Sequence, residues 1–466
     1  MNASAVQNDN ATRSATALRT FAEWAAAARW EDLPAAIRER AALVLADDLA
    51  AIVAARAEPE VIALQNGMAA SSGAPEASVF NGRGHRLDRY SAAVANGSAA
   101  DWCELDEGYR RAMCHAGLYT VPALLAEGEA SGATGRQLLR ALAVGYEAAA
   151  RVARAFSYSR LVLHPHGSLA AVGAAAAVAA LRGVAPGHFL GAVSAAATLV
   201  VPGPFNHAIQ GALVRNVWPG VGAWAGLRAV DWSAFGITGR AESLHDVYAD
   251  AFGAESLPEE LSEGLGRQWA IADGYQKVHA CCQYSHSAVE ATLGLIAGLA
   301  GPWQPGAIRR IRVDTHERGK ALDNVHPATS LAAKFSLQHI LATTAHFGHA
   351  GAEAFHSTTL TDPSIAALRE KVQIGPYEPE LSPPNDRPAR VTWEMADGST
   401  SSEVCLSARG GPDRPFAPEE IRAKIAGLTR DAYPAMPAML NRLLALDAAV
   451  LDTPWRETVE QMSAGT

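Results

Sequence analysis

Four short segments of the sequence carry polar side chains of reactive types within apolar, glycine-rich surroundings. They are residues 101–115 (DWCELDEGYRRAMCH), 163–167 (LHPHG), 214–220 (VRNVWPG) and 277–286 (KVHACCQYSH). Together they offer carboxylate, imidazole, guanidinium and ammonium groups. Such groups can move a proton and bind an anion within one site.

His115 is the natural candidate for a general base, because an imidazole titrates near neutral pH and can return its proton. Lys277 is a second candidate, as base or acid on the other face, if partial desolvation near Arg215 depresses its pKa. Asp101 would orient either His115 or Lys277. His164 is either a second acid or a histidine at the start of a helix, and both interpretations stand.

Arg215 lies among valine, tryptophan and glycine, where a solvated surface charge is not expected. Its planar guanidinium can bind a substrate carboxylate through two parallel hydrogen bonds. Arg110 and Arg111 are candidates for binding a second carboxylate, or else they are solvated charges at a helix end. Fixed cations stabilise the charge that develops on a carboxylate when the neighbouring carbon loses a proton. These residue types therefore favour proton removal next to a carboxylate.

The sequence contains several side chains that bind metals, but their spacing is not that of a metal site. They are Cys103, Cys114, His115, His279, Cys281, Cys282 and His286. Cys281 and Cys282 are contiguous and no second C-x-x-C follows, so we predict no metal and expect these two cysteines to be buried. The sequence has no P-loop, G-x-S-x-G or H-E-x-x-H motif, and residues 81–84 (NGRG) lack the third glycine of a dinucleotide site. We therefore predict no cofactor.

The ordered set of segments resembles the MmgE/PrpD family over nearly the whole chain. The segment 101–115 is followed by a helix-like run at 116–127 (AGLYTVPALLAE), and a Gly/Ala-rich run follows residues 164–165 (HP). Residues 214–220 and 277–286 complete the family's order and spacing. The residues that match the family's active-site positions by this resemblance are Asp101, His115, His164 and Lys277.

Three positions depart from the family pattern. Residues 103–105 (CEL) stand where the dehydratase-type and decarboxylase-type members have Asp-Asp-Thr, which removes a hydroxyl group. Arg215 stands where the decarboxylase has a lysine, and His339 stands where a tyrosine is common. The resemblance makes His339 a further candidate for substrate binding.

The resemblance implies a cofactor-independent lyase of the dehydratase type that removes a proton next to a carboxylate of a small di- or tricarboxylate. One alternative is an epimerase of an α-substituted dicarboxylate such as iminodisuccinate, and another is a decarboxylase of the cis-aconitate type. The departures at Leu105 and His339 favour the epimerase or an unfamiliar substrate. A non-catalytic alternative is a dimeric protein that binds polycarboxylates without turnover.

The elements that must position these residues are mainly helical. Apolar residues recur at helical spacing in the first two thirds of the chain, and the alanine-rich run 169–181 is expected at the centre of a helix bundle. Residues 307–317 and 389–408 instead have strand-like patterns, the latter around a hairpin signal at 396–398 (ADG). We predict a mainly α fold. A large all-helical domain is built from both chain ends, residues 15–275 and 409–466, and a smaller α+β lid domain is inserted at 276–408.

The composition of the chain indicates which partners and which cellular compartment to expect. Among the 466 residues, Lys plus Arg is 39 and Asp plus Glu is 48, a net charge of −9 that argues against nucleic acid or an anionic membrane as partner. The apolar runs 169–181 and 189–201 are shorter than the roughly 20 residues of a membrane-spanning helix. Residues 1–17 lack the pattern of a secretory signal, and the five cysteines suit a reducing cytoplasm. The family resemblance implies a homodimer.

We expect His115, His164, Arg215 and Lys277 to meet in one cleft between the two predicted domains. Because no group of side chains has the spacing of a metal site, exhaustive chelation should leave activity on the true substrate unchanged. Activity before and after dialysis against a chelator is the measurement. Loss of activity that a divalent ion restores would contradict the prediction.

Overall fold

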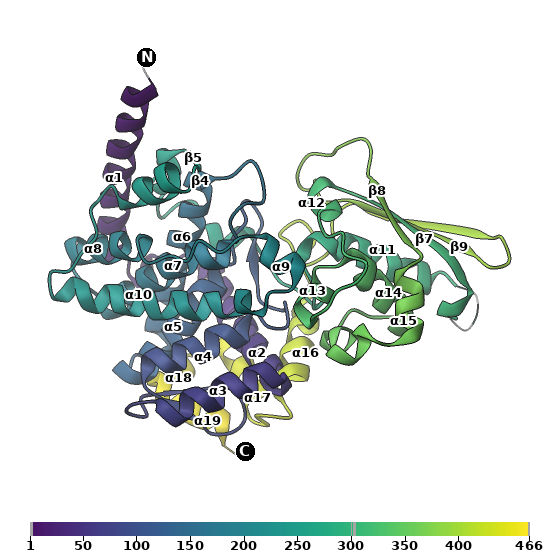
Figure 1. The fold of residues 1–466 in the computed structure, drawn as a ribbon. Helices are drawn as coiled ribbons and strands as arrows, with labels where there is room; N and C mark the ends of the chain where they lie inside the picture. Colours follow the sequence, from purple (N-terminus) through teal and green to yellow (C-terminus); the bar gives the residue numbers. More distant parts are fainter. Residues whose placement is uncertain (1–2, 300, 302–303, 465–466) are drawn as a thin grey trace.

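Two lobes of different composition make up the chain in this computed structural model, which describes residues 3–299, 301 and 304–464 (Figure 1). The larger lobe is helical and contains segments from both ends of the chain. Its main helices are α1 (Ala3–Ala27), α2 (Ala35–Ala54), α3 (Pro59–Ser71), α4 (Arg89–Ala100), α5 (Ala116–Ser131), α6 (Gly135–Ala155), α7 (Pro165–Arg182), α8 (Pro186–Ala197), α10 (Trp218–Ala234), α16 (Pro418–Thr429), α17 (Met436–Leu444), α18 (Ala448–Leu451) and α19 (Trp455–Ser463). The prediction of a mainly α fold is confirmed.

Helix α7 is the centre of the larger lobe, as its alanine-rich sequence predicted. Every residue from Pro165 to Leu181 is buried, and α7 contacts α5, α6, α8 and α10. Small side chains allow this close approach. A side-chain carbon added at Gly226 of α10 would lie 2.4 Å from the Cβ atom of Ala174 and 2.6 Å from the backbone nitrogen of Ala175.

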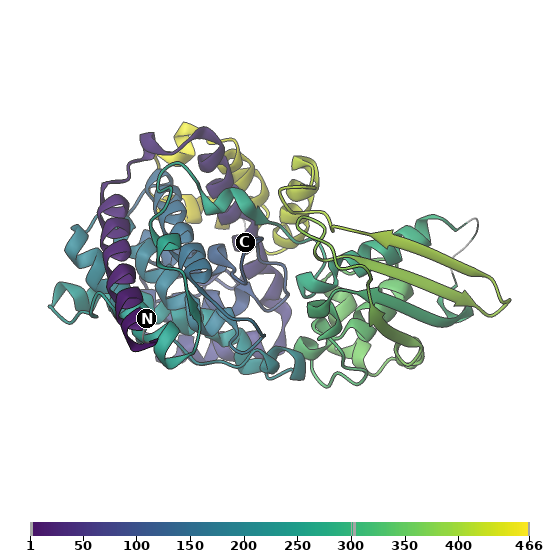
Figure 2. The same cartoon turned by 90° about the horizontal axis from the view of Figure 1, so that it is seen from above.

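The smaller lobe packs helices against one four-stranded sheet, which confirms the small α+β region. The strands are β7 (Ile308–Thr315), β8 (Val372–Pro376), β9 (Ala389–Met395) and β10 (Thr400–Cys405), in the order β10-β9-β7-β8. Only the β7–β8 pair is parallel among these described strands. Helices α11 (His286–Ala297) and α14 (Leu337–Phe347) contact the sheet, and Figure 2 shows the strands side by side along one face of this lobe. The shorter helices are α12 (Glu317–Lys320), α13 (Ser330–Lys334) and α15 (Pro363–Arg369).

The predicted hairpin lies between β9 and β10. The strands pair antiparallel, and Gly398 in the turn has a φ of 85°, a left-handed conformation that glycine adopts without strain.

Two hydrophobic cores match the two lobes only approximately. Apolar residues from 416 to 462 join the core of the larger lobe, as expected for a domain built from both chain ends. Cys281 and Ile340, which lie within the predicted insertion, also belong to that core, whereas Phe205 joins the smaller one. The domain boundaries at residues 276 and 408 stay predictions.

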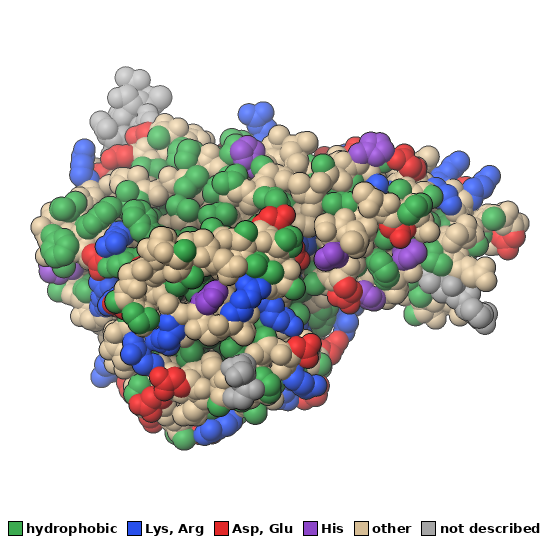
Figure 3. Space-filling model, turned by 60° about the horizontal axis from the view of Figure 1, so that its bottom comes forward, with side chains coloured by type: hydrophobic (Ala, Val, Ile, Leu, Met, Phe, Trp, Pro, Cys, Tyr) green, Lys and Arg blue, Asp and Glu red, His purple; other side chains and the backbone are tan. Residues whose placement is uncertain are grey.

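The surface carries no large area of one charge on the face shown in Figure 3, where basic and acidic side chains are interspersed. Hydrophobic side chains gather over the larger lobe on this face. Large exposed apolar side chains at α10 and just beyond its end include Trp224, Phe235 and Ile237. All five cysteines are buried and unpaired, which confirms the expectation for Cys281 and Cys282. No described helix has both the length and the apolar character needed to cross a membrane.

The contact between α7 and α10 gives a stability test. Gly226→Ala should lower the free energy of unfolding by about 1–3 kcal/mol, because the added methyl group meets the backbone of α7. Gly427→Ala in α16 is the matched control: nothing lies within 4 Å of its added carbon, so it should stabilise the helix by about 0.4–1 kcal/mol. Thermal melts of both variants decide, and equal effects would contradict the close packing.

Candidate active site

The site is built on the turn that joins α4 to α5. Asp101 caps the end of α4, and His115 is the residue before α5 begins. Between them, Glu104 has a φ of 53°, a left-handed conformation that is strained for a residue with a side chain. The turn brings Asp101, Glu104 and Asp106 together, and the carboxylate oxygens of these three buried residues lie within 4.8 Å of one another.

Asp106 orients His115. The Nδ1 atom of His115 lies 2.6 Å from Oδ2 of Asp106 and 2.9 Å from the carbonyl oxygen of Glu107. Both partners are acceptors, so Nδ1 must carry the hydrogen, and the neutral ring presents the lone pair of Nε2. Sequence reasoning gave this orienting role to Asp101, which instead contacts Arg215.

Lys277 lies behind Asp106. Its Nζ atom is 3.1 Å from Oδ1 of Asp106 and 3.3 Å from Oε2 of Glu104, and the side chain is fully buried. Burial lowers the pKa of Lys277, but the charges of Asp106 and Glu104 outweigh it, so the pKa lies well above its ordinary value. The expected depression of this pKa is wrong. Lys277 is a fixed ammonium that holds Asp106.

Arg215 neutralises the other side of the cluster. Its Nη1 atom contacts a carboxylate oxygen of Asp101 and lies 2.6 Å from Oε1 of Glu104. Burial raises the pKa of Glu104, but Arg215 and Lys277 outweigh it and hold that pKa below its ordinary value. Burial raises the pKa of Asp101 despite Arg215, with the nearby Glu104 charge adding to the rise.

His164 stands at the start of helix α7. It caps α7, and its ring nitrogens face two donors, Nε of Arg215 at 3.1 Å and the backbone nitrogen of His166 at 3.3 Å. A neutral ring can accept at only one nitrogen, so only one of these two contacts is a hydrogen bond to His164, and a protonated ring could accept neither. Burial and the Arg215 charge accordingly hold the pKa of His164 well below its ordinary value. His166 lies 3.1 Å from Asp101 and 2.9 Å from the hydroxyl of Tyr119.

The chain itself supplies the cations for this cluster. Three adjacent carboxylates could hold a metal ion, but Arg215 and Lys277 already lie against their oxygens. The two positive charges offset two of the three negative ones. The prediction of no metal stays a prediction.

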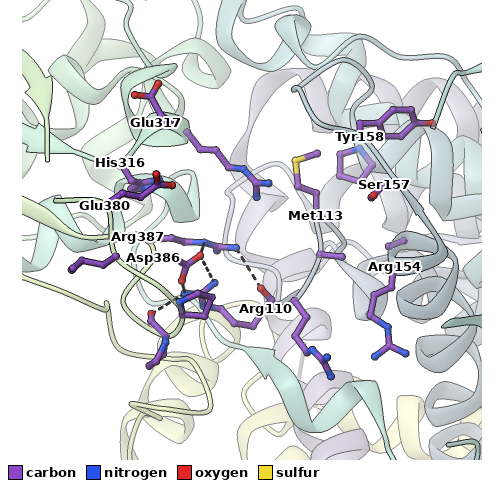
Figure 4. Close-up of a pocket in the computed structure, with 18 of the residues that line it drawn as sticks. Arg110, Met113, Arg154, Ser157, Tyr158, His316, Glu317, Glu380, Asp386 and Arg387 are labelled. Atoms are coloured by element: carbon purple, nitrogen blue, oxygen red, sulfur yellow. Dashed lines mark hydrogen bonds and ion pairs between the residues drawn. The ribbon is translucent and has the colours of Figure 1, made fainter. Parts of the chain in front are cut away.

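Two adjoining cavities lie next to the cluster. An inner pocket of about 50 Å³ is lined by His115, His164 and Arg215 from the larger lobe and by Tyr284, Phe335 and Arg387 further along the chain. An outer cavity of about 1540 Å³ shares Ala112, Met113, Pro165 and Arg387 with it. Figure 4 shows His316, Glu380 and Arg387 on one side of the outer cavity and Met113, Tyr158 and Arg154 on the other.

The four residues expected to meet do so, although not all line the cavity. Lys277 reaches His115 only through Asp106. Arg110 and Arg111 line the outer cavity, where Arg110 pairs with Asp386 of the opposite lobe and the Arg111 side chain is 57% exposed.

His339 is placed elsewhere. It contacts Arg369 at 3.0 Å and Thr359 at 3.2 Å inside the smaller lobe and lines neither cavity. Substrate binding by His339, which the family resemblance suggested, finds no support in this position.

Sequence reasoning missed three residues of the site. Asp106 and His166 lie within the quoted segments, and their neighbours His115 and His164 were the signal that could have found them. Arg387 lies in a proline-rich stretch, and its residue type gave no such signal.

Glu107 supports the site from behind. Its carboxylate accepts hydrogen bonds from the backbone of Gly117 at 2.6 Å and from the hydroxyl of Tyr146 at 2.9 Å. Burial raises the pKa of Glu107 to about 8, and the adjacent Asp106 charge adds to the rise. The backbone carbonyl oxygen of Glu107 is the second acceptor for Nδ1 of His115, so Glu107 contacts both the buried core and His115.

A mainly helical fold with a buried carboxylate–cation cluster facing a cavity between two lobes is the class of structure these observations define. Residues 19–254 match the model of the MmgE/PrpD N-terminal domain, and residues 279–447 match that of the MmgE/PrpD C-terminal domain. The chain belongs to the MmgE/PrpD family. The C-terminal match runs through α16 and α17, beyond the insertion predicted from the sequence.

Two curated relatives extend over nearly the full chain. The cis-aconitate decarboxylase-like protein oryM of Aspergillus oryzae is 26% identical over 95% of this chain and 95% of its own. A cis-aconitate decarboxylase of Aspergillus terreus is 27% identical over 97% of this chain and 96% of its own.

The raised pKa of Glu107 predicts a pH dependence of stability. Glu107 retains its proton in the folded state up to about pH 8 but loses it near its ordinary pKa of 4.5 when unfolded. The folded state therefore binds more protons between these values, and stability falls as pH rises through this window. Glu107→Gln can accept from the Gly117 backbone through its oxygen and donate to the Tyr146 hydroxyl through its nitrogen, and it does not titrate. Its thermal melts should therefore lose less stability between pH 5 and pH 8. Parallel curves for the variant and the wild type would contradict the assignment.

Proposed function

We propose that this protein is a lyase that acts on a small di- or tricarboxylate, with Nε2 of His115 as the base that removes a proton next to a carboxylate. The observation that carries the proposal is the double acceptor at Nδ1, which leaves the lone pair on Nε2. His115 lines the inner pocket with its side chain 15% exposed, so substrate can reach it. The family and its decarboxylase relatives support a lyase.

Dehydration fits a site with one free base. His115 takes the proton, and the C–H electron pair moves onto the carboxylate-stabilised carbon. That pair then forms the carbon–carbon double bond as the C–O bond to the hydroxyl group breaks. The imidazolium gives its proton to the departing oxygen, so water leaves and His115 returns to its neutral form. No cofactor takes part in this scheme.

Decarboxylation of cis-aconitate is the second candidate, favoured by the names of the relatives. Epimerisation is less well supported, because it needs a second acid on the opposite face of the substrate. Lys277 is behind Asp106, and His164 does not hold a proton to give near neutral pH. Ultraviolet absorbance of a new double bond, carbon dioxide release, and solvent deuterium uptake without bond cleavage distinguish the three reactions.

We further propose that the protein is a cytoplasmic homodimer that binds neither nucleic acid nor membrane. The unpaired cysteines support a reducing compartment. The exposed apolar side chains Trp224, Phe235 and Ile237 support association, because such side chains are enriched in interfaces. Sedimentation of the wild type tests the dimer.

His115→Ala should lower kcat by roughly 10²–10⁴-fold while substrate affinity stays near that of the wild type, because a base acts in the chemical step. Asp106→Asn should also lower kcat, because the amide no longer fixes the tautomer. His326→Ala is the control, since that side chain is 77% exposed and lines neither cavity. Measurements of kcat, KM and Tm on the same preparations decide. A near-native kcat for the His115 variant would remove His115 as the base.

A further inference from the structure

Arg387 is a buried cation without a counter-ion of its own. The residue precedes β9 and is 8% exposed. The Asp386 carboxylate lies 3.8 Å from its Nε atom, but Asp386 already accepts from Arg110, in one contact at 3.3 Å and in another that is shorter. The closest acceptor of Arg387 is the uncharged amide oxygen of Gln283. A guanidinium this buried is costly unless an anion pairs with it.

A second arginine of the same lobe stands near it. Nη1 of Arg318 donates to the hydroxyl of Tyr284 at 3.2 Å, and Arg318 forms no ion pair with the residues that the structure describes. The guanidinium carbons of Arg387 and Arg318 lie 5.1 Å and 5.7 Å from the centre of the Tyr284 ring. Both cations therefore contact the same aromatic ring. Arg110 and Arg387 share the single carboxylate Asp386, which leaves one positive charge of this pair unmatched.

Arg387 lies at the boundary between the two cavities. Arg387, which is labelled in Figure 4, lines both the inner pocket and the outer cavity. Arg318 lines the outer cavity. Pockets for small molecules usually measure about 300–1,000 Å³. An inner pocket of about 50 Å³ therefore admits only one end of a polycarboxylate, and the rest must lie in the outer cavity.

We propose that Arg387 binds a carboxylate of the substrate at the boundary of the two cavities, and that Arg318 binds a second carboxylate on the outer side. The inference rests on the proposed function and names the charge pattern of its substrate: at least two carboxylates, one on each side of Arg387. Arg215 does not compete for this role, because Asp101 and Glu104 already neutralise it. Burial lowers the pKa of Arg387, and an anionic ligand would remove that disadvantage.

Calorimetric binding of tricarballylate, a saturated tricarboxylate without a hydroxyl group, tests the inference separately from turnover. Arg387→Met should weaken binding roughly 30-fold or more, because a buried cation then no longer faces the carboxylate. Arg318→Met should weaken it less than about 5-fold, since that side chain is more exposed. Arg387→Lys should give an intermediate loss, because the ammonium keeps the charge but not the fork. With a reactive substrate, Arg387→Met should raise KM more than it lowers kcat.

Arg309→Met is the matched control, because Arg309 lies on β7 with its side chain 65% exposed and lines neither cavity. Arg387→Gln, which keeps an amide for Gln283, replaces the methionine variant if that variant does not fold. A large loss of binding in the Arg387 variants, a smaller loss in Arg318→Met and none in Arg309→Met support the inference even if no lyase turnover is found, and wild-type affinity in Arg318→Met removes the second carboxylate site. Wild-type affinity in Arg387→Met or Arg387→Gln overturns it, as does a wild type that does not bind tricarballylate at millimolar concentrations. Either result leaves the lyase proposal to its own turnover assay.

Discussion

The buried ion cluster of Asp101, Glu104, Asp106, Arg215 and Lys277 is the interaction on which the rest of the site depends. Each of these charges is costly to remove from water, and each is tolerable only because an opposite charge lies against it. The partners come from three distant segments of the chain. Removing one of them would leave a buried charge unpaired, so the cluster fixes the relative positions of these segments and, through Asp106, the orientation of His115.

The charge balance of the cluster explains why substrate binding must be sought elsewhere. Two cations face three carboxylates, so the cluster offers no excess positive charge to an anion. The arginines without a carboxylate partner of their own, Arg387 and Arg318, lie across the cavity, in a protein whose net charge is −9. The carboxylates that orient His115 are therefore separate from the cations proposed to hold the substrate.

The sequence predicted the mainly α fold, the central position of α7 and the hairpin at Gly398, because each depends on a local pattern of residue types. It also placed His115, His164, Arg215 and Lys277 together, but only through the family resemblance. What it could not predict is which carboxylate meets which cation. Asp106, and not Asp101, orients His115 because of a turn in which Glu104 adopts a left-handed conformation. No periodic pattern of residue types encodes that turn. The expected lowering of the Lys277 pKa was wrong for the same reason. The direction of that shift depends on two carboxylates whose distances from Lys277 are set by the fold.

The departures from the family pattern are not independent of one another. Glu104 and Arg215, which both differ from the residues expected at their positions, are in direct contact at 2.6 Å. Glutamate is longer than aspartate and arginine is longer than lysine, so the two departures form the two sides of one ion pair in this chain and keep the sign of the charge at each position. Leu105, where a hydroxyl is lost, lines neither cavity, and its backbone oxygen accepts from Lys424 at 2.8 Å. The lost hydroxyl therefore does not remove a group from the cavity wall, and the argument from Leu105 against the lyase reactions of the family loses its force.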